Sequence, residues 1–224
     1  MLIDPKFYVI AETIVKDING RAADSGRSLP ALGKVVQMAG PGDHIEIGTL
    51  FGASAIMAAL VKEEFGMTGK IYCVDPFVPR NPTIHYNEEK QRIKDNKEAT
   101  LEIVLENFDK FKVSDRMVVV PQPSYPWPAD LKDHEFVSGY IDGDHGNGMP
   151  WADFLSLRDR VKNFLMFDNF EEAYGDITTA ALRALTVGGW FLHYKEGIFL
   201  SMRRPFVVKD YDKDWGKLRD ASMI

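Results

Sequence analysis

The sequence contains a single cysteine, Cys73, among its 224 residues. One cysteine excludes an intramolecular disulfide and a multi-cysteine zinc site, and it fits a reducing compartment. The sequence also lacks a long apolar run, because the longest, residues 53–61, is far shorter than the roughly 20 residues that span a bilayer. The first ten residues, MLIDPKFYVI, have neither a basic start nor a cleavable apolar core. We therefore expect a soluble, cytoplasmic protein with no membrane partner.

An excess of basic residues is also missing. The chain has 27 Lys and Arg residues against 33 Asp and Glu residues, which gives a formal net charge of −6. A polyanion gains nothing from meeting further negative charge, so this balance argues against a general binder of nucleic acid or of anionic membranes. A local basic patch stays open, as does assembly into a homo-oligomer.

Neither an internal repeat nor a low-complexity tract is visible, and short β-rich runs alternate with longer helical ones. This alternation predicts an α/β fold with a doubly wound, mostly parallel sheet. Most of the strand candidates are almost continuously apolar, as strands covered on both faces should be. They are residues 44–47, 70–74, 116–120, 136–141 and 164–167. Two further β-like runs, 190–194 and 198–204, follow Gly188-Gly189 and predict a C-terminal antiparallel hairpin, making seven strands in all.

Helices are expected between the strands, and the whole chain, 1–224, is expected to form a single domain. Residues 1–40 should form one or two helices, and the last 20 residues should be only partly ordered. The expected helices between strands are 52–65, 97–111, 151–161 and 176–185. The connection 76–96 is much longer than the usual 2 to 6 residues, roughly, so we interpret it as either a surface excursion or a lid over a site.

A glycine turn follows the first strand, in the sequence E-I-G-T-L-F-G-A-S of residues 46–54. Gly48 and Gly52 let the backbone turn tightly and approach a ligand, and the helix start that follows offers free N–H groups. The pattern is not the three-glycine dinucleotide fingerprint, and by itself it could be a plain turn. Glu46 favours a binding role, since a carboxylate at the end of an apolar strand is costly to bury unless it binds something.

Acidic residues also stand at the ends of three later strands. Asp75 could accept hydrogen bonds from both ribose hydroxyls of an adenosine, or it could simply form the turn before Pro76. Asp142 and Asp168 should emerge on the same edge of a parallel sheet. With the amide oxygen of Asn169 they would form an oxygen-rich site suited to Mg²⁺, although both aspartates could instead cap the following helices.

Together these motifs resemble the class I S-adenosylmethionine-dependent methyltransferases, which have a Rossmann-like fold. The E-I-G-T-x-x-G-x-S segment and the D-G-D-H cluster at 142–145 followed by D-N at 168–169 are similar to the catechol and caffeoyl-CoA O-methyltransferases and the macrocin-type sugar O-methyltransferases. The resemblance covers about residues 30–205. It implies S-adenosylmethionine as cofactor, a divalent cation such as Mg²⁺, and a small hydroxylated acceptor, either a sugar or a phenol-like molecule.

The resemblance also implies roles for individual residues. The glycine turn would hold the methionine part of the cofactor, Asp75 the ribose, and Ser124 would lie near the adenine. The implied cofactor-binding residues are Glu46, Gly48, Thr49, Gly52, Ser54, Asp75, Ser124 and Asp142. The implied cation ligands are Asp142, Asp168 and Asn169.

Two positions depart from the catechol and caffeoyl-CoA pattern. His145 stands where those relatives have a catalytic lysine, so the base could be His145 or, as in the sugar-directed relatives, Asp144. Gly148 stands where the caffeoyl-CoA type often has tyrosine, which weakens the case for a flat aromatic acceptor. Two other interpretations stay open: a module that binds the cofactor without transferring a methyl group, and a metal-dependent phosphoesterase. The second is weak because a two-metal hydrolase needs several histidines, and the five in this chain are scattered.

Overall fold

The computed structural model describes residues 2–20, 28–77, 99–170, 175–187, 189–196 and 199–204. Within them the chain alternates helices and strands in the manner of an α/β fold. The helices are α1 (Pro5–Asp17), α2 (Ser28–Ala39), α3 (Ala53–Glu64), α4 (Leu101–Lys110), α5 (Met149–Arg158) and α6 (Gly175–Val187), with short 3-10 turns η3 (Ser114–Arg116) and η4 (Ala129–Leu131). The strands are β1 (His44–Ile47), β2 (Ile71–Val74), β3 (Met117–Val120), β4 (Phe136–Ile141), β5 (Val161–Phe167), β6 (Phe191–Glu196) and β7 (Phe199–Arg203).

The seven strands form one sheet in the order β3-β2-β1-β4-β5-β7-β6. The five strands from β3 to β5 are parallel, whereas β7 runs antiparallel to both β5 and β6. The strand order reverses between β1 and β4, and open α/β sheets bind ligands beyond the carboxyl ends of their strands at such a switch point. The topology therefore places a site at the carboxyl ends of β1 and β4.

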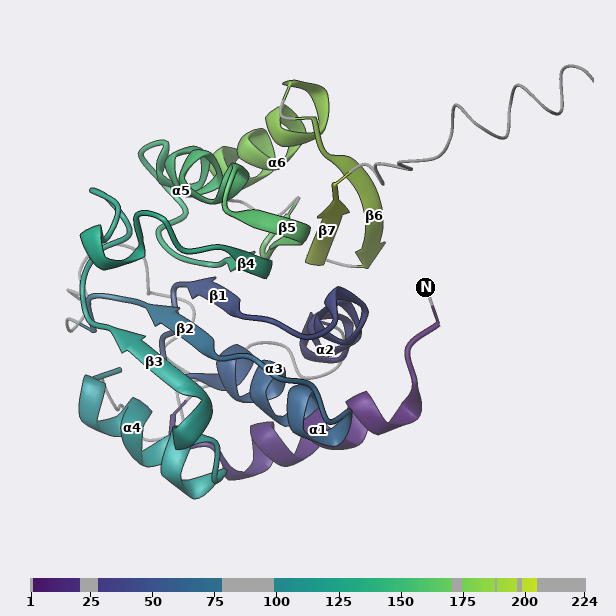
Figure 1. Cartoon of the computed structure of the whole chain (residues 1–224), viewed down its shortest axis with the longest axis vertical. Coiled ribbons are helices and arrows are strands. Elements are labelled where there is room, and N and C mark those ends of the chain that lie inside the picture. Colours follow the sequence, from purple (N-terminus) through teal and green to yellow (C-terminus); the bar gives the residue numbers. More distant parts are fainter. Residues whose placement is uncertain are drawn as a thin grey trace, which may run out of the picture.

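Helices cover both faces of the sheet, as Figure 1 shows, with α5 and α6 on one side and α1, α2 and α3 on the other. Each face has its own apolar core. One core contains α1 to α4 and includes the buried Phe7, Ile56 and Phe108. The other contains α5 and α6 and includes Phe154 and Trp190. Two-sided burial explains the almost continuous apolar runs of the central strands.

The structure confirms the predicted α/β fold, the seven-stranded sheet and the C-terminal antiparallel hairpin. The largest errors concern the bounds of α4, α5 and β5. Helix α4 begins at Leu101 and not at 97, because the side chain of Thr100 caps its first turn. Helix α5 begins at Met149, with Pro150 in its first turn, and ends at Arg158, whereas the prediction placed it at 151–161. Strand β5 begins at Val161 and not at 164. The prediction missed its first three residues because Lys162 and Asn163, which are exposed in the strand, interrupt the apolar pattern.

Two of the sequence predictions lie largely outside the described residues. The connection 76–96 is described only at Pro76 and Phe77, and the last 20 residues are not described. The lid and the partly ordered tail therefore stay predictions. Among the helices that the structure does describe, none is both long and apolar enough to cross a bilayer.

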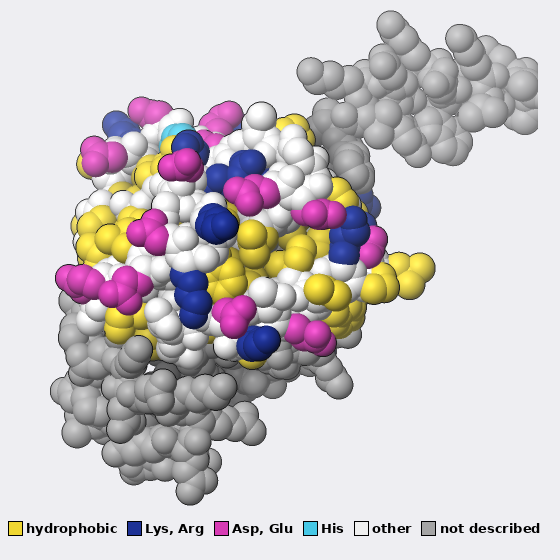
Figure 2. Space-filling view, turned by 90° about the horizontal axis from the view of Figure 1, so that it is seen from below, with side chains coloured by type: hydrophobic (Ala, Val, Ile, Leu, Met, Phe, Trp, Pro, Cys, Tyr) yellow, Lys and Arg dark blue, Asp and Glu magenta, His cyan; other side chains and the backbone are white. Residues whose placement is uncertain are grey.

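One side of the molecule, formed by the helices at the bottom of Figure 1, is seen in Figure 2. Apolar side chains gather near its centre, and charged side chains of both signs are interspersed around them. A shallow hollow of about 420 Å³ lies between α1 and α3, where Val9 and Leu60 stand beside Glu63 and Glu64. Neither sign of charge forms a continuous stripe on the part of this face that the structure describes.

Candidate active site

The register of the parallel strands aligns the functional candidates at one edge of the sheet. Ile47 is paired with both Val74 and Ile141, and Ile141 is paired in turn with Phe167. The residues that follow these four are brought side by side at the carboxyl ends of β1, β2, β4 and β5: they are Gly48, Asp75, Asp142 and Asp168. Backbone hydrogen bonds continue the alignment past the strands, for example from the amides of Asp142 and Asp168 at 2.9 and 3.2 Å.

The turn after β1 requires glycine at both of the positions that the sequence singled out. Gly48 has a φ of +89°, and a Cβ there would lie 2.1 Å from the carbonyl oxygen of Asp142. Gly52 has a φ of +87°, and a Cβ there would lie 2.7 Å from the ring of Phe108. A left-handed conformation and a close backbone approach both exclude a side chain. The turn after β1 is therefore packed directly against the turn after β4.

Asp75 organises this turn through its own carboxylate. Its Oδ2 accepts hydrogen bonds from the backbone amides of Thr49 at 2.9 Å and Leu50 at 3.0 Å, and its Oδ1 accepts from Phe77 at 2.8 Å. The sequence left open a ligand contact or a turn before Pro76, and the bond from Phe77 forms that turn. The sequence gave no sign of the bonds from Thr49 and Leu50, which lie 26 and 25 positions from Asp75. Asp75 thus holds the glycine turn in place, and its contact with a ribose stays a prediction.

Glu46 is the most unusual group at this edge. Its side chain is fully buried, and neither carboxylate oxygen has a hydrogen-bond partner among the described residues. Burial raises the pKa of Glu46 well above its ordinary value, and the nearby carboxylates of Asp142 and Asp75 raise it further, while the hydroxyls of Ser54 and Thr49 act in the opposite direction. A buried carboxylate without a partner is costly unless a ligand supplies one.

The acidic groups of β4 and β5 converge on the same region. Asp168 is 2% exposed. The pKa of the buried Tyr140 hydroxyl is raised by burial and then by the charges of Asp168, Asp142 and Glu46, so these carboxylates all lie close to one phenol. Asn169 has a φ of +52°, in the left-handed region, directly after Asp168. The structure thus brings the three predicted cation ligands to one edge.

The two candidate bases after β4 differ in their surroundings. The Nε2 of His145 lies 3.3 Å from Oδ1 of Asp142, and its side chain is 18% exposed. Asp144 is exposed, and its Oδ1 accepts a hydrogen bond from the amide of Gly146 at 3.0 Å, in a local turn. Only His145 is directed by a measured contact toward the predicted cation ligands.

Ser124, predicted to lie near an adenine, is half-buried in the loop after β3. Its hydroxyl donates a hydrogen bond of 2.6 Å to Oδ1 of Asp153, on α5. The sequence analysis did not single out Asp153. Its position in the middle of α5 resembles that of any polar helical residue, and only the fold shows that it is 2% exposed.

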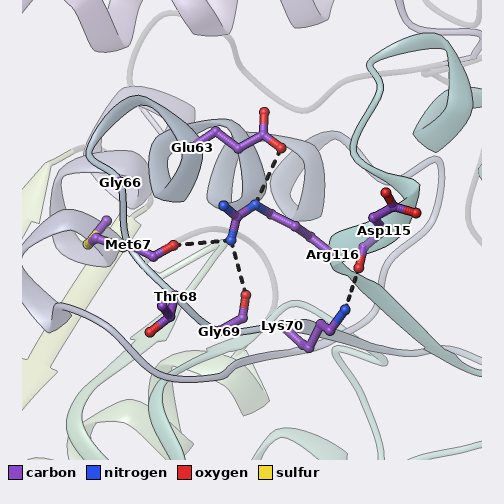
Figure 3. A pocket seen from close by; sticks show the side chains of 8 residues that line it. All are labelled: Glu63, Gly66, Met67, Thr68, Gly69, Lys70, Asp115 and Arg116. Atoms are coloured by element: carbon purple, nitrogen blue, oxygen red, sulfur yellow. Dashed lines mark hydrogen bonds and ion pairs between the residues drawn. The ribbon is translucent and has the colours of Figure 1, made fainter.

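A larger hollow, of about 580 Å³, lies at the opposite end of the sheet, before β2 and β3. Figure 3 shows that its two basic side chains contact the protein: Arg116 contacts Glu63 at 3.3 Å and donates to two backbone carbonyls, and Lys70 donates to the carbonyl of Asp115. Among the residues that line this hollow, none has a buried polar side-chain atom without a hydrogen-bond partner. We therefore place the candidate active site at the carboxyl edge.

Comparison with known proteins identifies the family of the chain. A family model described as "Methyltransferase domain" matches residues 45–170, which run from β1 to just beyond β5 and so include the whole carboxyl edge. The chain belongs to this family. It is a class I methyltransferase that uses S-adenosylmethionine, as the resemblance of the glycine turn and of the acidic strand ends implied.

Solved structures share the fold of the methyltransferase. An O-methyltransferase from Bacillus cereus in complex with SAH is 15% identical, with a TM-score of 0.58 and coverage of 92% of this chain and 93% of that one. A putative caffeoyl-CoA O-methyltransferase from Staphylococcus aureus is 10% identical, with a TM-score of 0.60 and coverage of 89% and 92%. A putative O-methyltransferase from Klebsiella pneumoniae is 12% identical, with a TM-score of 0.59 and coverage of 90% of each chain. No curated protein matches the sequence.

Proposed function

We propose that this methyltransferase transfers the methyl group of S-adenosylmethionine to a hydroxyl oxygen of a small acceptor, and that a divalent cation assists the transfer. The observation that carries the proposal is the buried Glu46 carboxylate, without a partner among the described residues, beside the cluster of Asp142, Asp168 and Asn169. The O-methyltransferases among the structural neighbours support an oxygen acceptor. The formal net charge of −6 favours a small molecule over a nucleic acid.

The residues present fit the cofactor. Both oxygens of Glu46 are buried acceptors without a hydrogen bond of normal geometry in the described part of the chain, and a cationic amino-acid group would satisfy them. Gly48 and Gly52 keep the turn free of side chains so that the backbone amides of α3 stay accessible to a ligand. Asp75 fixes that turn and stands where a ribose would lie.

The donor set also fits a hard cation. Two carboxylates and one amide oxygen are ligands that Mg²⁺ accepts, and three protein ligands would leave positions for water and for the acceptor oxygen. The described residues contain no cluster of three or more His, Cys, Asp and Glu side chains that could hold a metal, so Asn169 would have to complete the set. A bound cation would lower the pKa of the acceptor hydroxyl.

Within this arrangement His145 is the better base. A phenol with a pKa of about 10 is mostly protonated at neutral pH, and its proton must leave as the methyl–oxygen bond forms and the methyl–sulfur bond breaks. His145 is held at 3.3 Å from Asp142, beside the predicted cation ligands, and can accept that proton. Asp144 is exposed and committed to the local turn with Gly146.

The first test measures the cofactor. Isothermal calorimetry with S-adenosylhomocysteine on the full chain should show one site per chain. Absence of heat on folded protein would contradict the proposal. Binding without methyl transfer to any catechol or sugar acceptor would instead favour a module that only binds the cofactor.

The second test asks whether methyl transfer requires a divalent cation. Asp168→Ala, or excess chelator on the wild type, should abolish methyl transfer while leaving the affinity for S-adenosylhomocysteine unchanged, because the cofactor would rest mainly on Glu46 and Asp75. Asp115→Ala is the matched control, since it removes an exposed carboxylate at the other end of the sheet. Full activity in excess chelator would eliminate the cation and leave Asp142 and Asp168 as capping residues.

A further inference from the structure

The crossover between β3 and β4 is a loop that contains only one short 3-10 turn. Strands β2 and β1 lie between β3 and β4, so at a spacing of about 4.8 Å per strand the ends of β3 and β4 are roughly 14 Å apart. The crossover contains only the short η4, and α4 lies before β3 in the chain. The residues that follow β3 and those that follow β4 are therefore not held together by hydrogen bonds between neighbouring strands.

One hydrogen bond nevertheless joins these two regions. Ser124, in the loop after β3, donates to Asp153 on α5, the helix after β4, at 2.6 Å. The loop is also held further along, because Trp127 donates to the carbonyl of Leu131 at 3.1 Å and the guanidinium of Arg160 lies 5.1 Å from the Trp127 ring centroid. The Ser124–Asp153 bond thus draws the start of the crossover toward α5.

Asp153 also lies next to the turn that carries the predicted cation ligand and base. Its Oδ2 would be 3.6 Å from a Cβ placed on Gly143, the residue between Asp142 and Asp144. One carboxylate therefore contacts the loop after β3 through one oxygen and faces the turn after β4 with the other.

This position is unfavourable for a carboxylate. The pKa of Asp153 is raised to about 6: burial is the largest cause, the hydrogen bond from the Ser124 hydroxyl lowers the pKa, and the charge of Asp144 raises it. Asparagine has nearly the same shape without the charge and would avoid that cost. A residue kept at a cost to stability beside a ligand site is commonly there for function.

We propose that Asp153 is a positioning residue for cofactor binding, which acts through Ser124 and Gly143 to fix the gap between the loop after β3 and the turn after β4. This inference rests on the proposed function and on the expected position of Ser124 near the adenine, with which the adenosine end of the cofactor would lie between these two segments. Asp153 sets the width of that space without touching the methyl group or the acceptor. Its loss should therefore weaken cofactor binding and spare the chemical step.

The experiment compares Asp153→Ala, Asp153→Asn, Ser124→Ala and the double variant Ser124→Ala/Asp153→Ala. Each alanine variant should bind S-adenosylhomocysteine about tenfold more weakly by calorimetry, the effect of losing one charge-assisted hydrogen bond. The KM for S-adenosylmethionine should rise similarly, with kcat at saturating cofactor within about twofold of the wild type. The double variant should be no weaker than the weaker single variant, because both changes remove the same bond.

Asp153→Asn separates positioning from a general structural role. It should restore part of the affinity, because its amide oxygen still accepts from Ser124, and its melting temperature at pH 7 should not fall below that of the wild type. Asp159→Asn is the matched control, a largely exposed carboxylate at the other end of α5, and should change nothing.

Three results would overturn the inference. They are wild-type affinity in both alanine variants, a loss of kcat equal to the rise in KM, or additive effects in the double variant. If the wild type itself bound no S-adenosylhomocysteine, the proposed function would fall together with this inference. Binding by the wild type with unchanged binding by the variants would overturn this inference alone.

Discussion

Lys62 and Glu46 are both fully buried charged residues, but they lie at opposite ends of the same parallel strands. The ammonium of Lys62 donates to the carbonyls of Gly40 and Gly42 at 3.3 and 2.8 Å, below the amino end of β1. Near the carboxyl end of the same strand, the oxygens of Glu46 have no hydrogen-bond partner among the described residues. The fold satisfies one charge internally and leaves the other for a ligand.

The same contrast separates the two ends of the parallel strands as a whole. At the amino ends, Arg116 is engaged by Glu63 and by backbone carbonyls, and His134 pairs with Asp43 at 2.8 Å. At the carboxyl ends, carboxylates face one another, so that each raises the cost of the next. Buried polar groups without hydrogen-bond partners therefore indicate this site better than the volume of a hollow does.

The largest expected effect comes from replacing a glycine with alanine, which tests whether the backbone is more tightly packed at the carboxyl ends of the strands than at the amino ends. Gly48→Ala should abolish measurable binding of S-adenosylhomocysteine and cost about 3 kcal/mol or more in the free energy of unfolding, since its Cβ would lie 2.1 Å from the Asp142 carbonyl. Gly40→Ala has a similar φ, +82°, with nothing within 4 Å of its Cβ. It should cost only about 1 to 2 kcal/mol and leave binding intact. Urea unfolding and calorimetry measure both, and equal binding by the two variants would remove the contrast.

The second prediction removes each of the two buried charges in turn. Glu46→Gln should weaken binding of S-adenosylhomocysteine by about 100-fold, as expected for a lost charged hydrogen-bond acceptor, without lowering stability at pH 7. Lys62→Met should do the reverse: it leaves two carbonyls unpaired, costs about 1 to 3 kcal/mol, and does not change binding. Calorimetry paired with urea unfolding checks both signs. A Glu46→Gln protein that is less stable and binds normally would make Glu46 a structural residue.

Much of this arrangement could be predicted from the sequence because it depends on local pattern. The apolar runs placed the strands, the acidic residues at their ends marked the carboxyl edge, and Gly48 and Gly52 marked a tight turn. The register of β1 with β2 and β4 then brought the marked residues together. In a parallel sheet all carboxyl ends lie at one edge, so the position at which a strand ends in the sequence is enough to place the next residue at that edge.

What could not be predicted depends on contacts between distant residues. Nothing near Asp75 in the sequence indicates that its carboxylate holds the amides of Thr49 and Leu50. The bond from Ser124 to Asp153 joins residues 29 positions apart. One lies in the loop after β3 and the other on the helix after β4, and these two strands are not neighbours in the sheet. The early start of β5 was missed because Lys162 and Asn163 are exposed there, and exposure is a property of the assembled fold.

The third prediction concerns pH and isolates one carboxylate at the carboxyl end. Burial raises the pKa of Asp153 from 3.8 to about 6, so the folded state holds this proton more tightly than the unfolded state. The contribution of Asp153 is fully present below about pH 4 and is lost as the pH rises through about 6. The stability of Asp153→Asn relative to the wild type should therefore increase by roughly 2 to 3 kcal/mol between pH 4 and pH 7. Urea unfolding of both proteins across that range measures the difference, and a constant difference would contradict the unfavourable burial.

The smallest expected effect tests the amino end alone. Arg116→Lys keeps the charge beside Glu63, but lysine cannot bond to Glu63 and to the carbonyls of Met67 and Gly69 in the same planar geometry. The ion pair is partly exposed, so the loss should be about 1 kcal/mol in the free energy of unfolding. Affinity for S-adenosylhomocysteine and the rate of methyl transfer should both equal those of the wild type. If the variant instead altered cofactor affinity, the hollow in Figure 3 would be coupled to the active site through β2 and β3, and the two ends of the sheet could no longer be treated as one structural and one functional.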